Sequence, residues 1–241
     1  MSEKIRIFRA SELLATGYPR SKLIQGFVDV NKAAWPPPVP QRYVWDEEKM
    51  ELQLKNPDLL YCALKGEKII GTVTFVYKTE DSIMSCQNWD EISSNGTLAG
   101  HDESGEYAFG VDLSVSPDSQ GNNVSERLIS TSFLISGILA GKKGVFLGSR
   151  IPSYHKYADK MSIEDYVLGK NRDGKTRDPE IRLYQSNGFR IVKIIPGYME
   201  DPDSLDYGVL MLWESSFYRY AHRMKMLTKL AQFVTAKVML R

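Results

Sequence analysis

Hydrophobic and polar residues alternate, or apolar residues run together, in several short stretches of the chain. Ile5 to Arg9 alternates residue by residue, which is the period of a strand with one buried face. The runs from Leu59 to Leu64 and from Ile69 to Tyr77 are joined by Lys65-Gly66-Glu67-Lys68, a pattern typical of a β-hairpin. The predicted strands cover residues 5–9, 59–64, 69–77, 107–115, 145–147, 189–195 and 207–213.

Helical patterns fill much of the sequence between these strands. Residues 19–34 predict a helix that ends at the breaker Trp35-Pro36-Pro37-Pro38-Val39-Pro40. Further helices are expected over residues 46–56, 124–140 and about 162–167, and around Leu183 and Tyr184 before Asn187-Gly188. Residues 78–105 are polar and rich in Gly, Ser and Asn, which predicts a long loop around Trp89. The order of elements predicts an α/β domain.

The composition is that of an ordinary soluble globular protein, with 241 residues of which 42% are hydrophobic. Cys62 and Cys86 lack the clustered spacing of a zinc site, and the chain has three scattered histidines, so no metal site is expected. The N-terminus shows no secretion signal, and no stretch reaches the ~18 apolar residues of a membrane span. We therefore expect a cytoplasmic protein with reduced thiols.

The net charge of +1 conceals two opposite parts. Residues 215–241 carry six basic groups and no acid, so residues 1–214 sum to 25 − 30 = −5. Phe217, Tyr220, Met224, Leu227, Ala231, Val234 and Val238 recur at helical spacing within this basic segment. We predict a body over residues 1–214 and a basic amphipathic helix over residues 215–241. The apolar face of that helix would pack on its own domain, join two copies in a homodimer or lie peripherally on an anionic membrane, and its charge would suit an acidic acyl carrier protein.

The junction from Val115 to Ser125 suggests a phosphate site. A strand, a tight polar turn and a helix start place several unpaired backbone N–H groups around one point, and the helix dipole adds positive charge there. The turn lacks the Lys-Ser/Thr of a P-loop and the three glycines of a dinucleotide fingerprint. The residues of this junction are Gln120, Gly121, Asn122, Asn123, Val124 and Ser125.

With the order of elements, this junction resembles the acyl-CoA pyrophosphate loop, Gln/Arg-x-x-Gly-x-Gly/Ala, of the GNAT superfamily of N-acetyltransferases. Gln120 matches the first position, whereas Asn123 and Ser125 stand where the two small residues belong. Leu183-Tyr184-Gln185-Ser186-Asn187-Gly188-Phe189 is similar to the family's Leu-Tyr-x-x-x-Gly-Phe. Stretches around Trp89-Asp90-Glu91-Ile92 and Arg150-Ile151-Pro152 resemble the GNAT domain that is fused to nitrilase-type amidohydrolases.

The resemblance implies a mixed, mostly antiparallel central sheet flanked by helices, and acetyl-CoA or another acyl-CoA as co-substrate. It implies that the Tyr184 phenol protonates the departing thiolate. Backbone N–H groups from Leu113 to Val115 would stabilise the thioester oxyanion. Because Asn tolerates left-handed backbone better than most residues, Asn123 is a mild replacement for glycine.

The general base has several candidates. Uninterrupted alternation places Tyr107, Phe109, Val111 and Leu113 on the face of Val115, with no acid among them and Asp112 on the other face. Glu106 at the strand start and His101 in the preceding loop remain, with a water relay as an equal alternative. Trp89, Arg150 and Tyr154 are expected at the acceptor, with Arg150 holding an acceptor carboxylate.

We therefore predict an N-acyltransferase that moves an acyl group from acyl-CoA to the primary amine of a small molecule or peptide by direct attack. One alternative is a long-chain N-acyltransferase that draws from acyl-CoA or an acyl carrier protein near a membrane. Another is a non-catalytic domain that binds CoA or a partner protein. Nucleic-acid binding is disfavoured, because residues 1–214 are net acidic.

Overall fold

The computed structural model describes residues 4–218 except 36, 38, 120, 122 and 217. Gln120, Asn122 and nearly all of the predicted C-terminal helix lie outside the described residues.

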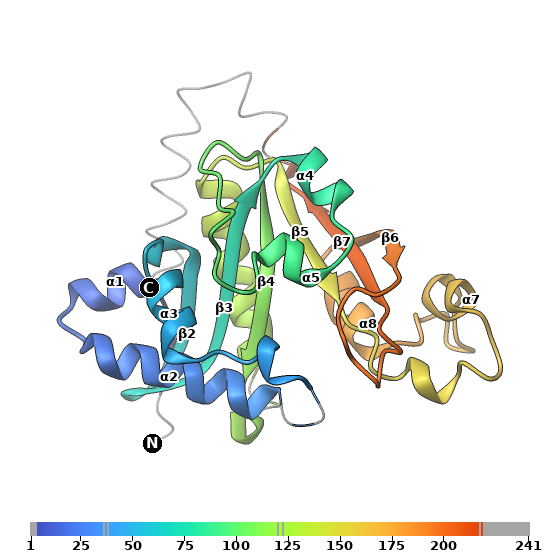
Figure 1. The fold of residues 1–241 in the computed structure, drawn as a ribbon, viewed down its shortest axis with the longest axis horizontal. Helices are drawn as coiled ribbons and strands as arrows, with labels where there is room; N and C mark the ends of the chain where they lie inside the picture. Colours follow the sequence, from blue (N-terminus) through green and yellow to red (C-terminus); the bar gives the residue numbers. More distant parts are fainter. Residues whose placement is uncertain are drawn as a thin grey trace.

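The predicted strands assemble into one sheet (Figure 1). Its order is β1-β2-β3-β4-β5-β7-β6, and only β4 and β5 run parallel. This arrangement confirms the mixed, mostly antiparallel sheet. The strands are β1 (Ile5–Arg9), β2 (Leu60–Lys65), β3 (Lys68–Lys78), β4 (Tyr107–Val115), β5 (Gly144–Ser149), β6 (Arg190–Ile195) and β7 (Gly208–Glu214).

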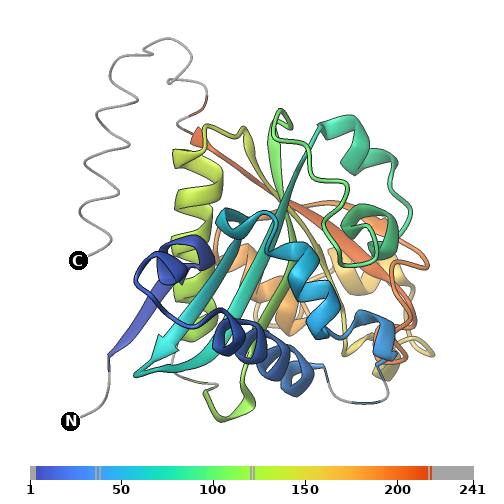
Figure 2. The same cartoon turned by 60° about the vertical axis from the view of Figure 1, so that its left-hand side comes forward.

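Helices cover both faces of the sheet (Figure 2). On one face, α2 holds Asn31 against Asp112 and Ser114 of β4. On the other face, the start of α6 lies over β3, where Val124 and Leu128 leave no room for a side chain at Gly71. The helices are α1 (Ala10–Ala15), α2 (Arg20–Ala34), α3 (Glu47–Gln53), α4 (Glu80–Ser85), α5 (Trp89–Ser93), α6 (Val124–Ser132), α7 (Ile163–Leu168) and α8 (Pro179–Ser186), with the π-helical η4 (Phe133–Leu139) continuing α6 and short 3-10 helices at η1 (Gln41–Tyr43), η2 (Pro57–Leu59), η3 (Pro117–Ser119) and η5 (Tyr154–Lys156).

The long loop predicted over residues 78–105 is wrong in part, because it contains α4 and α5. Thr79 caps the first of these helices by accepting from the backbone N–H of Ser82, and Asn88 caps the second by accepting from that of Glu91. Such caps satisfy backbone groups that a short helix leaves unpaired. The Trp89 side chain is buried, and its indole Nε1 donates to the Val111 carbonyl oxygen at 2.9 Å. This contact ties the segment to the central strand.

A β-bulge at Val111 changes which side chains of β4 share a face. Thr74 pairs with Asp112, whereas the next residue, Phe75, pairs with Gly110, so Val111 has no partner on β3. A bulge of this kind inserts one extra residue and reverses the alternation beyond it. The uninterrupted alternation expected over residues 107–115 is therefore wrong. Leu113 and Val115 still share the α6 side of the sheet, but Tyr107 and Phe109 belong with Asp112 on the α2 side.

The two parallel strands separate beyond the bulge. β4 pairs with β5 from Tyr107 only as far as Gly110, opposite Leu147. The last residues of β5, Gly148 and Ser149, pair only with β7. The backbone of β4 from Val111 onward therefore has no ladder partner on its β5 side, and an opening forms between the strands.

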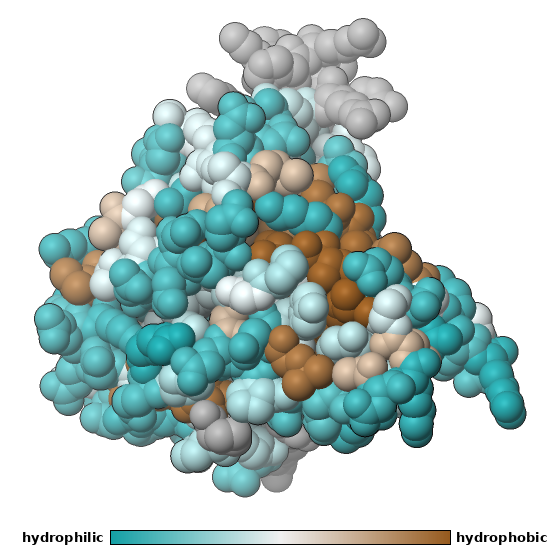
Figure 3. Space-filling view, turned by 45° about the vertical axis from the view of Figure 1, so that its right-hand side comes forward, coloured by the Kyte–Doolittle hydropathy of each residue, from teal (hydrophilic) through white to brown (hydrophobic). Residues whose placement is uncertain are grey.

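Hydrophilic residues cover most of the face seen in Figure 3, with a larger apolar area and smaller ones between them. In the described part of the chain, no helix has the length and apolar character needed to cross a bilayer. Cys62 and Cys86 are both free thiols.

Candidate functional site

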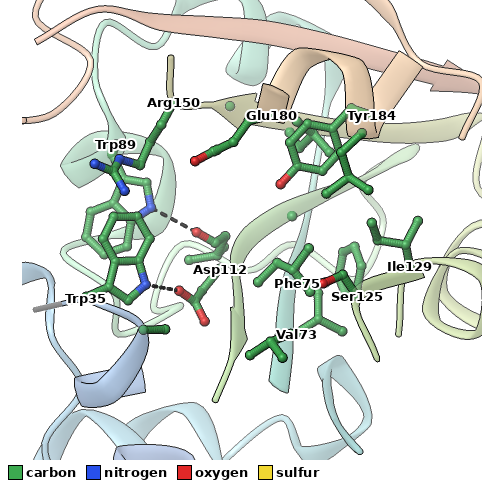
Figure 4. A pocket seen from close by; sticks show the side chains of 18 of the residues that line it. Trp35, Val73, Phe75, Trp89, Asp112, Ser125, Ile129, Arg150, Glu180 and Tyr184 are labelled. Atoms are coloured by element: carbon green, nitrogen blue, oxygen red, sulfur yellow. Dashed lines mark hydrogen bonds between the residues drawn. The ribbon is translucent and has the colours of Figure 1, made fainter. Parts of the chain in front are cut away.

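A cavity of about 370 Å³ occupies the opening between β4 and β5 (Figure 4). Its floor is the separated part of β4 with the end of β5, and its walls come from the end of α2, from α5, from the start of α6 and from α8. One end is apolar and lies against α6, where Ser125 and Ile129 line it. The other end is aromatic and carries ionisable groups. The aromatic and ionisable residues at this end are Trp35, Trp89, Asp112, Arg150, Glu180 and Tyr184.

Asp112 is a buried carboxyl group at the aromatic end of the cavity. Its Oδ1 accepts hydrogen bonds from Trp35 Nε1 at 3.0 Å and from Asn31 Nδ2 at 3.2 Å, and its Oδ2 accepts from Ser114 Oγ at 2.9 Å. Burial raises the pKa of Asp112 to about 6, although these hydrogen bonds act in the opposite direction. The group therefore titrates close to neutral pH.

Glu180 and Tyr184 project into the cavity from one face of α8 (Figure 4). They are four residues apart, a spacing that stacks side chains on one face of a helix. Burial raises the pKa of Glu180 to about 7, against a lowering effect of Arg150. Burial also raises the pKa of the Tyr184 phenol above its usual value, so the phenol keeps its proton at neutral pH. α8 thus presents a carboxyl group that can accept a proton near neutral pH beside a phenol that is protonated there.

Arg150 follows β5 and is held by a buried partner. Its Nε donates to Asp201 Oδ2 at 2.7 Å and its Nη2 donates to Asp201 Oδ1 at 2.8 Å. The Asp201 side chain is only 2% exposed, and Ser204 Oγ also donates to it. The guanidinium lies 4.8 Å from the centre of the Trp35 ring. The donor pair that the sequence assigned to an acceptor carboxylate is therefore occupied by Asp201.

The predicted phosphate loop contains two left-handed residues among those that the structure describes. Gly121 has φ +81° and Asn123 has φ +54°, both in the left-handed region. Asn123 directly precedes α6, so the first backbone N–H groups of the helix follow a left-handed residue. Ser125 in the first turn lines the cavity, whereas Val124 is buried. The helix start therefore faces the apolar end of the cavity.

The structure brings six of the twelve described residues of the predicted site together around this cavity. Those that line the cavity are Trp89, Leu113, Val115, Ser125, Arg150 and Tyr184.

Gly121, Asn123 and Val124 belong to the loop and helix start beside the cavity and do not line it, and three predicted catalytic and acceptor residues lie elsewhere. Glu106 bonds to Lys143 Nζ at 3.2 Å, and this hydrogen bond holds the pKa of Glu106 below its usual range. His101 Nδ1 accepts from the backbone N–H of Tyr77 at 3.1 Å and does not line the cavity. Tyr154 is buried in an aromatic cluster, with its ring centre 5.1 Å from that of Tyr166.

Sequence reasoning missed Asp112 and Glu180. Asp112 was assigned to the face away from the site, but the cavity opens where the two strands separate and reaches across the edge of β4. Glu180 carries a signal that was available, because it precedes Tyr184 by four residues in a helix.

The chain is similar to two curated proteins of Bacillus subtilis (strain 168). It is 30% identical to "Uncharacterized N-acetyltransferase YkwB" over 199 residues, which cover 82% of this chain and 87% of that protein. It is 28% identical over 220 residues to "Probable hydrolase YhcX", covering 90% of this chain and 42% of the length of that protein. No protein-family model matches the chain.

Solved structures share the fold. The loading GNATL domain of CurA from Lyngbya majuscula superposes with a TM-score of 0.71 at 19% identity, over 88% of this chain and 98% of that domain. The GphF GNAT-like decarboxylase in complex with isobutyryl-CoA superposes with a TM-score of 0.69 at 23% identity, over the same shares of the two chains.

Proposed function

The chain belongs to the GNAT superfamily, and from this premise we propose that it transfers an acyl group from an acyl-CoA thioester to a primary amine. The observation that carries the proposal is the cavity between β4 and β5, which connects the start of α6 with Glu180 and Tyr184 on α8. Donor site, acceptor site and proton-transfer groups would then share one cavity.

The donor would enter along α6. The phosphates would lie at the backbone N–H groups after Asn123, where the helix dipole favours negative charge. The left-handed backbone at Gly121 and Asn123 supports this placement, because it is the conformation that the missing glycine would have supplied. The thioester would lie against β4 beyond Val111, where backbone N–H groups without a ladder partner could stabilise an oxyanion.

Glu180 and Tyr184 would move the protons. The acceptor arrives as an ammonium group and loses one proton to Glu180, so that its nitrogen can attack the carbonyl carbon of the thioester. The new C–N bond forms, the C–S bond breaks, and the thiolate takes a proton from Tyr184. The nitrogen releases its second proton to restore the phenol. The products are an amide, free CoA and one proton released to solvent from Glu180.

Calorimetry with acetyl-CoA, a long-chain acyl-CoA and free CoA tests the donor. We expect acetyl-CoA and CoA to bind with similar affinity, because most contacts involve the part that they share. Binding of the long-chain thioester alone would favour the long-chain N-acyltransferase. Absence of binding by all three would reject an acyl-CoA enzyme and leave the non-catalytic or carrier-protein alternatives.

Tyr184→Phe tests the chemistry. It keeps the ring and removes the phenol, so we expect turnover to fall by about 10²-fold while the Kd for acetyl-CoA stays within about twofold. Tyr157→Phe, in a partly exposed tyrosine outside the cavity, is the matched control. Unchanged turnover in Tyr184→Phe would remove the phenol as the acid.

A further inference from the structure

The charges at the aromatic end of the cavity are unbalanced. Asp112 and Glu180 line it as carboxyl groups, and the single described cation in its lining, Arg150, is paired with Asp201. Resting on the proposed function, we propose that the acceptor is a small aralkyl amine that binds as a cation and has no carboxylate of its own. This differs from the sequence-based expectation, in which Arg150 holds an acceptor carboxylate.

Glu180 supplies a carboxylate that is available to a ligand. In the described part of the chain its side chain has no hydrogen bond or ion pair, although it is half-buried and projects into the cavity (Figure 4). An ammonium group beside it would provide the missing partner and stabilise its ionised form. A carboxylate brought to the same place would meet a like charge.

Arg150 favours the ionised form of Glu180, but its hydrogen-bond donors are held by another partner and offset this preference only in part. Both oxygens of Asp201 accept from its guanidinium, and the pair is mostly shielded, with the Arg150 side chain 18% exposed and that of Asp201 2% exposed. A carboxylate ligand would have to compete with Asp201 for the guanidinium. Because Asp201 belongs to the same chain, its pairing with Arg150 has no entropic cost of association, whereas binding of a ligand has one. Arg150 therefore acts as part of the wall, stacked on Trp35, rather than as a free anion site.

The aromatic wall favours an acceptor with a flat apolar body. Trp89 is fixed by its hydrogen bond to Val111, and the Tyr43 ring meets it edge-on with ring centres 5.3 Å apart. Trp35 is fixed by its hydrogen bond to Asp112. Ring faces attract ammonium groups and pack against other rings. Because a cavity of about 370 Å³ must also hold the thioester, the acceptor has to be small.

Matched pairs of acceptors that differ only by a carboxylate test the proposal. Phenethylamine is compared with phenylalanine, and tyramine with tyrosine. Two quantities are measured: kcat/KM for acetyl transfer, and the Kd for the acceptor with the CoA-saturated protein. We expect both to favour the amine by at least about tenfold, which corresponds to about 1.4 kcal/mol. Equal or tighter binding of the amino acids, or no binding of either class, overturns the proposal.

Variants of Glu180 and Asp201 test whether charge, rather than the shape of the cavity, sets the preference for the amine over the amino acid. Glu180→Gln removes one repelling carboxylate, so the ratio of the Kd of the amino acid to that of the amine should fall by about threefold or more in the same binding assay.

Asp201→Asn releases Arg150 and should shift the preference toward the amino acid. Asp203 is an exposed aspartate in the same turn, and Asp203→Asn should leave the preference unchanged. If Asp201→Asn fails to fold, the Glu180→Gln ratio decides alone, and an unchanged ratio contradicts the proposal. Donor calorimetry is independent of these measurements, so failure of the acyl-CoA proposal is recognised separately.

Discussion

At the scale of single residues, Asp112 shows how burial changes the chemistry of a carboxyl group. An exposed aspartate ionises well below neutral pH, whereas burial raises the pKa of Asp112 to about 6. Its hydrogen bonds to Trp35 and Asn31 connect the central strand with α2 and the aromatic wall. The sequence could identify the residue but not its environment, because that environment depends on a bulge and on a helix distant in the chain.

The raised pKa of Asp112 predicts a loss of stability with rising pH. Between about pH 4 and 6 the native protein retains a proton that the unfolded chain has released, so the free energy of unfolding falls as the pH rises through this range. The expected contribution is about 2–3 kcal/mol. Urea unfolding at pH 4 and pH 7 measures the effect. The free energy of unfolding should decrease less between these pH values in Asp112→Asn than in the wild type. Asp173→Asn, in an exposed loop position, should behave as the wild type, and equal decreases in all three proteins would contradict the prediction.

Glu180 predicts the pH profile of catalysis. Because a base must lose its proton to act, kcat/KM should rise with pH through about 7, the raised pKa of Glu180. Glu180→Gln should lower kcat/KM by about 10²-fold and abolish this rise near pH 7. The remaining pH dependence should then reflect only the ionisation of the free amine substrate. Steady-state kinetics from pH 5.5 to 9 measures the profile. The exposed Glu164→Gln serves as control, and an unchanged rise in Glu180→Gln would exclude Glu180 as the base.

At the scale of elements, the strands and long helices could be predicted because each buries a periodic apolar face. α2, predicted over residues 19–34, is Arg20–Ala34, and the helix expected over residues 124–140 is α6 with its π-helical continuation. The two helices within residues 78–105 were missed because each spans fewer than two turns and depends on its cap. The bulge in β4 leaves no mark in the sequence, since one extra apolar residue does not alter a run of apolar residues.

The loop before α6 allows a direct test of its left-handed position. A residue other than Gly, Asn or Asp at φ +54° is destabilised by about 1–2 kcal/mol. We expect Asn123→Ala to lower the free energy of unfolding by about this amount and to weaken acetyl-CoA binding, whereas Asn123→Gly should retain both. Denaturant unfolding and calorimetry measure the two effects. Equal behaviour of the Ala and Gly variants would show that the left-handed backbone is unimportant for the loop.

At the scale of the whole molecule, charge separates the body from the C-terminal segment. Residues 1–214 sum to −5 and residues 215–241 to +6. The described loop and first turn of α6 do not supply a local excess of positive charge either. Asp118 and Glu126 are acidic there, and Arg127 is basic. An anionic donor therefore depends on backbone N–H groups and the helix dipole, as the proposed phosphate position requires.

This distribution predicts a weak dependence of donor binding on salt. Raising the KCl concentration from 50 to 300 mM screens exposed charges but leaves direct N–H contacts in place, so the Kd for acetyl-CoA should change by less than about threefold. The full-length variant Lys225→Gln/Lys229→Gln/Lys237→Gln should show the same Kd and the same salt response by calorimetry. A steep loss of affinity with salt that disappears in this triple variant would instead assign the C-terminal cations to the donor phosphates. If the prediction holds, those cations are left for a second copy, a membrane surface or an acidic carrier protein, because the donor does not need them.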